Sequence, residues 1–313
     1  MEELMEFFTG EDARRYRRAF SRVGFALLAL TALPTGLQVL VQLLLFSIAP
    51  GLLENTLFLY LVAAFCTYLV GFPAAALVLL SLPVEEEKPP ERRLAPPVWL
   101  GLWLLTMGWI YITNLITLYL MEGLSSLVGE TIPNALDSMN GLPVSFLLVY
   151  SCVLAPVCEE VFFRGMLLPR LRPWGDGFAL CASALLFALV HANLYQMLYA
   201  FAVGLVLGGV YLYTGRVRGC VLLHAGVNFV SAGLLPLLRA LGQAGEHILS
   251  LLTLFSMLWA VYWTFLRGRE RLTGFAAKTN WGDGETWGHF CVNFGMTLFV
   301  LALVGTMWLT MRQ

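Results

Sequence analysis

Long apolar segments recur along the whole chain, and they restrict its fold more than any other feature. A helix needs about 20 apolar residues to cross the hydrocarbon core of a bilayer. Nine segments approach or exceed that length, with boundaries near 24–48, 57–82, 98–121, 144–168, 176–194, 197–214, 219–237, 248–266 and 289–310. Only a short stretch around Asn193 separates the fifth segment from the sixth. We therefore expect an all-α, polytopic transmembrane helix bundle of eight or nine spans.

The composition agrees with a membrane protein. Hydrophobic residues make up 59% of the chain and charged residues 12%, which is about half the charge of an ordinary soluble domain. The net charge of -1 indicates no basic surface for nucleic acid, so no nucleic-acid partner is expected. The six cysteines lack a CxxC spacing and lie mostly in apolar stretches, which indicates neither a disulfide framework nor a zinc knuckle.

The distribution of basic residues predicts an orientation. Lys and Arg concentrate in cytoplasmic loops of membrane proteins. With the N-terminus inside, sixteen of them fall on the inner side, and only Arg239 and Arg312 fall on the outer side. The polar segment 1–22 lacks the apolar core of a signal peptide, so we expect it to be a cytoplasmic lead-in. We expect an integral membrane protein with its N-terminus in the cytoplasm. Compact loops without organelle signals favour a prokaryotic plasma membrane.

Three neighbouring spans contain ionisable or amide side chains. A charge inside the bilayer costs several kcal/mol, so such residues mark candidate functional sites. They occur in the stretches APVCEEVFFRG, LLFALVHAN and VLLHAGVN, and they are Glu159, Glu160, Arg164, His191, His224 and Asn228. The alternative is a set of polar contacts that hold the helices together. Three clusters in neighbouring spans favour a functional site.

Helical spacing sorts these side chains. Glu160 and Arg164 are four residues apart, on one helix face, and are expected to form an ion pair. Glu159 lies about 100° around the helix from Glu160 and is therefore not committed to Arg164. His224 and Asn228 are also four residues apart and can face one cavity.

Two further residues near these clusters have structural interpretations. Pro156 removes the usual helical donor to the carbonyl of Cys152, which predicts a local kink. Phe187 precedes His191 by one turn, and we expect it to pack beside the site.

The three stretches resemble the sequence motifs of one family. EEVFFR matches EExxxR, FALVH matches FxxxH, and HAGVN matches HxxxN of the CAAX protease/bacteriocin-processing family. The intervening run GLVLGGVYLYTG is also similar to the family. This family includes the type II CAAX prenyl endopeptidases and bacterial proteins linked to bacteriocin processing or immunity. The resemblance covers residues 144–232.

The resemblance implies a role for each motif residue. Glu159 would be the catalytic carboxylate and His191 its partner in activating water. His224 and Asn228 would stabilise the oxyanion or complete the water site, and Glu160 with Arg164 would brace the helix. The expected activity is that of an intramembrane endopeptidase acting on a membrane-embedded or lipidated protein or peptide.

The expected organisation follows from the spans and the motifs. We divide the chain into a cytoplasmic segment (1–22), N-terminal transmembrane helices with an external loop (23–143), the catalytic core helices (144–238) and C-terminal transmembrane helices (239–313).

Two questions stay open at the level of sequence. Glu159, His191 and His224 offer three ligands for zinc with a fourth position for water, but the HExxH spacing is absent. A metal-free mechanism by glutamate and histidine is the alternative, which we slightly favour. A catalytically silent relative, acting as a bacteriocin immunity or scaffold protein, would carry the same motifs. A transporter would also place acids and histidines in the membrane, but it would not need these three motifs.

Overall fold

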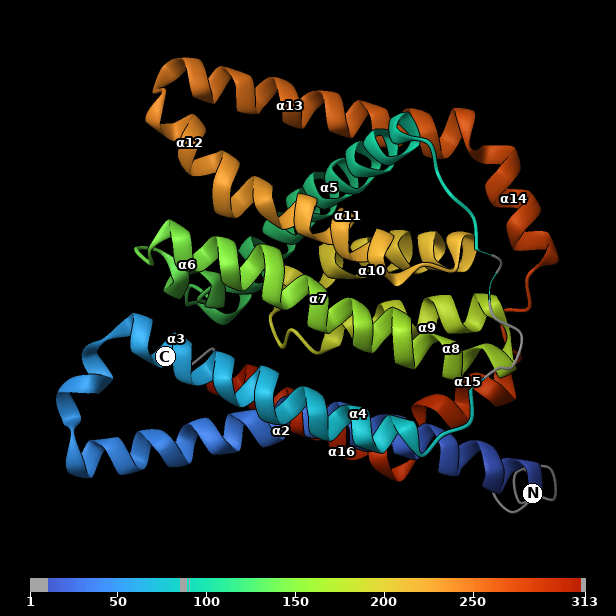
Figure 1. Cartoon of the computed structure of the whole chain (residues 1–313), viewed down its shortest axis with the longest axis horizontal. Coiled ribbons are helices and arrows are strands. Elements are labelled where there is room, and N and C mark those ends of the chain that lie inside the picture. Colours follow the sequence, from blue (N-terminus) through green and yellow to red (C-terminus); the bar gives the residue numbers. More distant parts are fainter. Residues whose placement is uncertain (1–10, 85–88, 90, 311–313) are drawn as a thin grey trace. The chain divides into compact units, whose positions relative to one another are not determined.

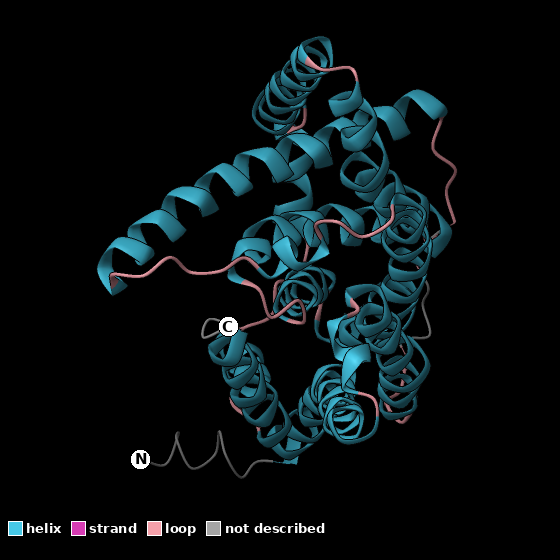
Figure 2. Cartoon of the chain, turned by 90° about the vertical axis from the view of Figure 1, so that its left-hand side faces the viewer, coloured by secondary structure: helices cyan, strands magenta, loops and turns pink. Residues whose placement is uncertain are grey.

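The computed structural model describes residues 11–84, 89 and 91–310, and every regular element among them is a helix (Figure 1 and Figure 2). Residues 1–10 of the expected cytoplasmic segment, Lys88 and Arg312 lie outside the described residues. The chain divides into two compact units, Met1–Glu85 with Trp281–Arg312 and Glu86–Asn280. Each unit is described by itself.

The first unit is built on the long helix α2 (Glu11–Ile48), which packs against α4 and α16. Its other elements are η1 (Pro50–Glu54), α3 (Thr56–Ala64), η2 (Phe65–Gly71), α4 (Phe72–Leu80), α15 (Gly284–Cys291) and α16 (Phe294–Thr310). A methyl group on Gly24 would lie 2.2 Å from the backbone carbon of Gly295. Small residues at both positions therefore let α2 and α16 approach closely, as in other membrane helix pairs.

The second unit contains the three motif stretches. Its elements as far as α9 are α5 (Pro96–Val128), η3 (Ala135–Met139), α6 (Val144–Val149), η4 (Tyr150–Leu154), α7 (Ala155–Glu160), η5 (Val161–Leu167), α8 (Leu168–Leu171), η6 (Arg172–Trp174) and α9 (Asp176–Leu189). The remaining elements are α10 (Leu194–Thr214), α11 (Val217–Phe229), η7 (Val230–Leu234), α12 (Leu235–Ala240), α13 (Gln243–Val261), η8 (Tyr262–Arg267) and α14 (Arg269–Lys278).

The all-α transmembrane fold is confirmed, and the number of spans is corrected. Among the described residues, seven helices are long and apolar enough to cross a membrane, or eight if α15 and α16, bent by 57°, count as one span. The fifth expected span is only α9, with 14 residues. At 1.5 Å per residue it is about 21 Å long, shorter than the roughly 30 Å hydrocarbon core. Among the described residues, the structure therefore supports seven or eight spans, and the ninth expected span is not found.

Two expected loops are partly helical. The segment 267–288, expected to be a solvated loop, includes α14 and the start of α15. Helix α5 continues to Val128, so the connection expected to begin at residue 122 begins later. Apolar content alone locates neither boundary, because amphipathic helices extend beyond the hydrocarbon core.

Wide helical turns precede four prolines. The π-helical segments η2, η4, η5 and η7 each end two residues before a proline, at Pro73, Pro156, Pro169 and Pro236. A proline has no N–H to donate to the carbonyl four residues earlier. Before Pro156, the backbone N–H of Ala155 bonds the carbonyl of Tyr150, five residues back instead of four. The predicted kink at Pro156 therefore takes the form of a widened turn.

Helices α9 and α10 form a close antiparallel pair. A methyl group on Gly204 would lie 2.9 Å from Cα of Ala184, and one on Gly208 would lie 2.6 Å from Leu180. The contacts pair a higher residue number on α10 with a lower one on α9, so the two helices run in opposite directions. The Gly204-x-x-x-Gly208 spacing makes this approach possible.

Basic side chains lie at one end of the second unit. At one end, Arg216 pairs with Glu91 at 3.1 Å and Arg172 pairs with Asp176 at 2.7 Å. At the other end, the hydroxyl of Tyr195 donates to the carbonyl of Ile132 at 2.9 Å. The basic end is the one that the distribution of Lys and Arg predicts to be cytoplasmic. The orientation itself stays a prediction.

Replacing Gly204 with Ala tests the α9–α10 contact. We expect the added methyl to force the helices apart and to lower the stability of the protein by about 1–3 kcal/mol. Gly209→Ala, on the same helix, is the matched control because nothing lies within 4 Å of the added atom. Thermal unfolding in detergent measures both. Equal melting temperatures for the two variants would contradict the contact.

Candidate active site

Glu159 and His191 lie at equal distances along the chain from the turn of a helical hairpin. The hairpin turns at Gly175, and Phe163 and Phe187 lie twelve residues before and after it. Their ring centroids are 5.1 Å apart, so positions equidistant from the turn face each other. Glu159 and His191 lie sixteen residues before and after Gly175, one helical turn further along. Glu159 and His191 are therefore equally far along the chain from the turn of the hairpin.

A buried ion pair forms the floor of the site. Nη1 of Arg164 lies 3.0 Å from Oε1 of Glu160, as their spacing predicts, and both side chains are fully buried. Nη2 of Arg164 donates to the backbone carbonyl of Gly204 at 3.1 Å. The guanidinium lies over the ring of Phe187, 4.5 Å from its centroid. Buried charges need such partners, because an unpaired charge in this environment is costly.

His224 connects the two glutamates. Its Nδ1 lies 2.9 Å from Oε1 of Glu160, and its Nε2 lies 4.0 Å from Oε2 of Glu159. Arg164 donates to the same oxygen of Glu160, so we take Nδ1 of His224 to be the donor in this bond. In a neutral imidazole the lone pair of Nε2 is then directed towards Glu159.

His191 occupies the turn that follows α9. Its Nδ1 bonds the carbonyl of Phe187 at 2.7 Å. The next residue, Ala192, has a φ of 48° and is the only non-glycine residue with positive φ among those described. Such conformations cost about 1–3 kcal/mol and cluster at functional sites. The ring of Phe187 packs edge-on against both imidazoles, at 5.1 Å from His191 and 5.9 Å from His224.

Asn228 is tied to the widened turn before Pro156. Its side-chain amide donates to the carbonyl of Ser151 at 2.7 Å. That carbonyl lacks helical donors because Ala155 bonds Tyr150 instead and Pro156 has no N–H. The sequence predicted a freed carbonyl at Cys152, whereas the side-chain bond is made one residue earlier. The proline and the third motif are thus linked directly.

The structure adds two contacts that the sequence did not predict. The bond between Glu160 and His224 joins the first and third motifs, and the carbonyl of Gly204 joins α10 to the ion pair. The two adjacent glutamates of the first motif gave no indication of which histidine each would contact. The Gly204-x-x-x-Gly208 spacing is the signal that could have located the second contact.

Whether the candidate site could hold a metal depends on how its donor atoms are placed. Both imidazoles bond through Nδ1 and leave Nε2 for another partner, an arrangement common to metal ligands. However, no group of three or more His, Cys, Asp or Glu side chains among the described residues is placed to hold a metal ion. The zinc set of Glu159, His191 and His224, considered from the sequence, is not brought together in this structure and stays a prediction.

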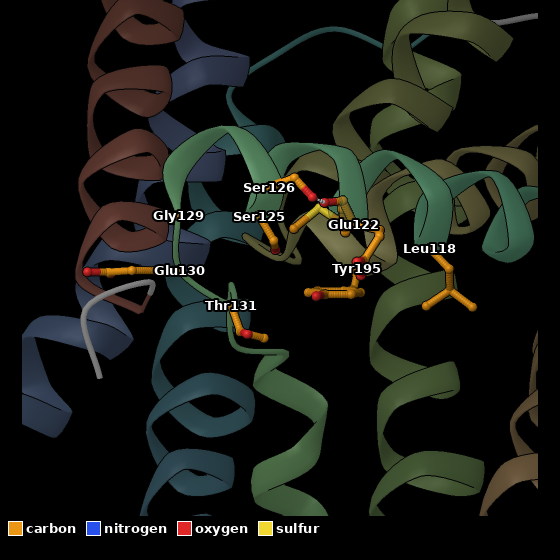
Figure 3. A pocket seen from close by; sticks show the side chains of 9 residues that line it. Leu118, Glu122, Ser125, Ser126, Gly129, Glu130, Thr131 and Tyr195 are labelled. Carbon is orange, nitrogen blue, oxygen red and sulfur yellow. Dashed lines mark hydrogen bonds between the residues drawn. The ribbon is translucent and has the colours of Figure 1, made fainter.

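A separate groove lies at the end of α5. It has a volume of about 460 Å³ (Figure 3). Its lining residues come from α5, from the connection that follows it and from α10, and they are Leu118, Met121, Glu122, Ser125, Ser126, Gly129, Glu130, Thr131 and Tyr195. Its polar character comes from Glu122, Glu130 and neighbouring hydroxyl groups. None of the motif residues lines it.

Comparison with known proteins supports the resemblance. Residues 141–230 match the family model "Type II CAAX prenyl endopeptidase Rce1-like". The matched segment contains all six motif residues and ends just beyond Asn228. No curated protein and no solved structure matches the chain.

Removing one partner of the ion pair tests its role. We expect Arg164→Leu to lower stability by about 3–5 kcal/mol, because the carboxylate of Glu160 stays buried without its partner. The double variant Glu160→Gln/Arg164→Leu should recover part of that loss, since no isolated charge remains. Thermal unfolding in detergent measures the three proteins. A double variant less stable than Arg164→Leu would contradict this account.

Proposed function

We propose that the protein is an intramembrane endopeptidase, because residues 141–230 match the family model "Type II CAAX prenyl endopeptidase Rce1-like". It hydrolyses a peptide bond of a membrane-associated substrate, using water activated by Glu159. The observation that supports this most directly is His224, held between Glu160 and Glu159. A polar contact that only holds helices together would not need two carboxylates and an imidazole within membrane-spanning segments.

The separation between Glu159 and His224 suits a water molecule. Oε2 of Glu159 and Nε2 of His224 are 4.0 Å apart, too far for a direct hydrogen bond. A water that donates one hydrogen to each acceptor would lie about 2.8 Å from both. Glu159 is partly accessible, with 18% of its side chain exposed, whereas Glu160 is fully buried. Only Glu159 is therefore open to water and substrate.

The proposed reaction is general-base hydrolysis. Glu159 takes a proton from the water while the water oxygen bonds to the carbonyl carbon of the scissile peptide. The carbon–nitrogen bond then breaks, and the proton held by Glu159 passes to the leaving amine. Glu160 and Arg164 contribute by fixing the ring of His224, as the orienting carboxylate does in other catalytic triads.

His191 and Asn228 are assigned to the carbonyl side of the reaction. His191 lies as far from the turn of the hairpin as Glu159 does. It supplies a second imidazole, which can bond the water or, when protonated, donate to the oxyanion. The amide of Asn228 carries a second hydrogen besides the one bonded to Ser151. Donors aimed at the developing oxyanion are the usual source of electrostatic stabilisation in acyl transfer.

The substrate class follows from the surroundings of the site. The catalytic carboxylate lies on a segment that crosses the membrane, Val144–Trp174. A substrate must therefore present its peptide bond within or at the bilayer. Prenylated CAAX proteins, bacteriocin leaders, quorum-sensing propeptides and other lipid-anchored proteins satisfy this requirement.

Glu159→Gln tests the proposed base. We expect cleavage to fall about 10²–10⁴-fold, because the amide cannot accept the proton, while the protein stays folded. Glu246→Gln is the control, since Glu246 is exposed on α13. The assay compares the membrane peptides of cells carrying each variant by mass spectrometry. Undiminished processing by Glu159→Gln would disprove the assignment, and no processing by the native protein would favour the silent relative.

Metal content tests the choice of mechanism. The proposed general-base mechanism predicts that purified, active protein contains no stoichiometric metal and retains its activity in the presence of chelators. Elemental analysis and activity are measured on the same sample. If chelation abolished activity and added zinc restored it, a zinc centre would replace the proposed base.

A further inference from the structure

Helix α5 packs against α11, the helix that carries the third motif (Figure 1). Trp99 and Trp103 are four residues apart and share one face of α5. A methyl group on Gly219 of α11 would lie 2.5 Å from the ring of Trp99. One on Gly226 would lie 3.5 Å from the indole nitrogen of Trp103. The two glycines are seven residues apart, on one face of α11, so both indoles contact that face.

The indole of Trp103 also bonds the backbone of the third motif. Its Nε1 donates to the carbonyl of Gly226 at 2.9 Å. The usual helical donor to that carbonyl is the N–H of Val230, but this N–H bonds the carbonyl of Val227 instead. A backbone carbonyl within a membrane segment needs a protein donor, because the bilayer core offers no water to replace it. Trp103 supplies that donor from another helix.

The bond lies where α11 changes into a widened turn. The π-helical segment η7 begins at Val230, directly after the end of α11. Met107, one turn after Trp103 on α5, packs with Val227 and Val230 in a buried apolar cluster. The contact with α5 therefore covers the last turn of α11, which carries Asn228, and the first residue of η7.

Helix α11 lies between α5 and the candidate site. Gly226 comes two residues after His224 and two before Asn228, about 200° around the helix from each. The motif side chains bond the other way, His224 to Glu160 and Asn228 to the carbonyl of Ser151. A change in the backbone at Gly226 would therefore move both motif side chains.

We propose that Trp103 is a positioning residue, which fixes the third motif through the carbonyl of Gly226. The proposal rests on the function proposed above and adds α5 to its site. With the last turn of α11 held by the indole, the amide of Asn228 stays directed at the substrate carbonyl, and the imidazole of His224 stays beside Glu159. Helix α5 lies outside the segment that matches the family model.

Hydrogen exchange tests this contact without a substrate. Trp103→Phe keeps an aromatic ring but removes the N–H, so the turn at Gly226 should open more often. A neutral hydrogen bond contributes about 0.5–1.5 kcal/mol, which corresponds to roughly 2–13-fold faster exchange. Mass spectrometry of the peptide that contains residues 226–230, with the protein in detergent, measures the rate.

Trp259→Phe is the matched control. The indole of Trp259 donates to the carbonyl of Gly101 at 2.8 Å, a bond that joins α13 to α5 and involves no motif residue. We expect a similar fall in melting temperature for both variants, but native exchange at residues 226–230 in Trp259→Phe. Replacing the indole of Trp103 with benzothiophene removes the N–H and keeps the ring shape. This third protein separates the bond from the packing if Trp103→Phe folds poorly.

Catalysis provides the second readout, with a farnesylated CAAX peptide in liposomes as the probe. A small displacement of a catalytic group can cost about 10²-fold in rate. Trp103→Phe should therefore lower kcat by roughly 10–100-fold with KM unchanged, whereas Trp259→Phe should stay within about twofold of the native kcat. Combined with Asn228→Ala, Trp103→Phe should cause little further loss, because both changes act on one group.

Three results would overturn the role of Trp103: native exchange in Trp103→Phe, an equal kcat for Trp103→Phe and Trp259→Phe, or losses that multiply in the double variant with Asn228→Ala. If exchange accelerates but Glu159→Gln cleaves as well as the native protein, the contact stands and the proposed function fails.

Discussion

The buried ion pair between Glu160 and Arg164 is the interaction on which the rest of the site depends. Its carboxylate accepts from both Arg164 and His224, and its guanidinium binds the carbonyl of Gly204. Three transmembrane segments are therefore held by one pair of charges. Replacing the pair with apolar side chains would remove a costly desolvation, so stability alone does not explain it. Its specific effect is to fix the imidazole of His224 beside Glu159.

Backbone geometry supports the same arrangement. The prolines in the segment Val144–Trp174 widen its turns at η4 and η5, on both sides of the two glutamates. The first of these turns frees the carbonyl of Ser151 for Asn228. Wide turns of this kind occur frequently at functional sites, because they redirect side chains without breaking the helix. The motif residues and the prolines thus form one structural unit.

The sequence predicted the class of fold and the ion pair of the candidate site, but not the contacts between its helices. Apolar length predicted a membrane bundle, and the four-residue spacing predicted the pairing of Glu160 with Arg164. The same length criterion counted α9 as a span, because it cannot separate a short helix from the turn that follows. Phe187 was expected beside the site, and it packs between His191 and His224.

The contacts that were missed are tertiary ones. Sequence spacing shows which side chains share a helix face, but it does not show which helix lies opposite that face. For this reason the bond from Glu160 to His224 had no counterpart in the sequence. The resemblance paired Glu159 with His191. In the structure these two residues are equally far along the chain from the turn of the hairpin. His224 is the histidine whose ring lies 4.0 Å from Glu159.

The central claim is that Glu159 and His224 act together on one water molecule. The most direct test is a double-mutant cycle on the rate of cleavage, with Glu159→Gln, His224→Gln and the double variant compared at equal amounts of folded protein. Residues that act as a unit are strongly non-additive. The account predicts that the double variant is no slower than the slower of the two single variants. Losses that multiply in the double variant would show that the two residues act independently and would contradict the account.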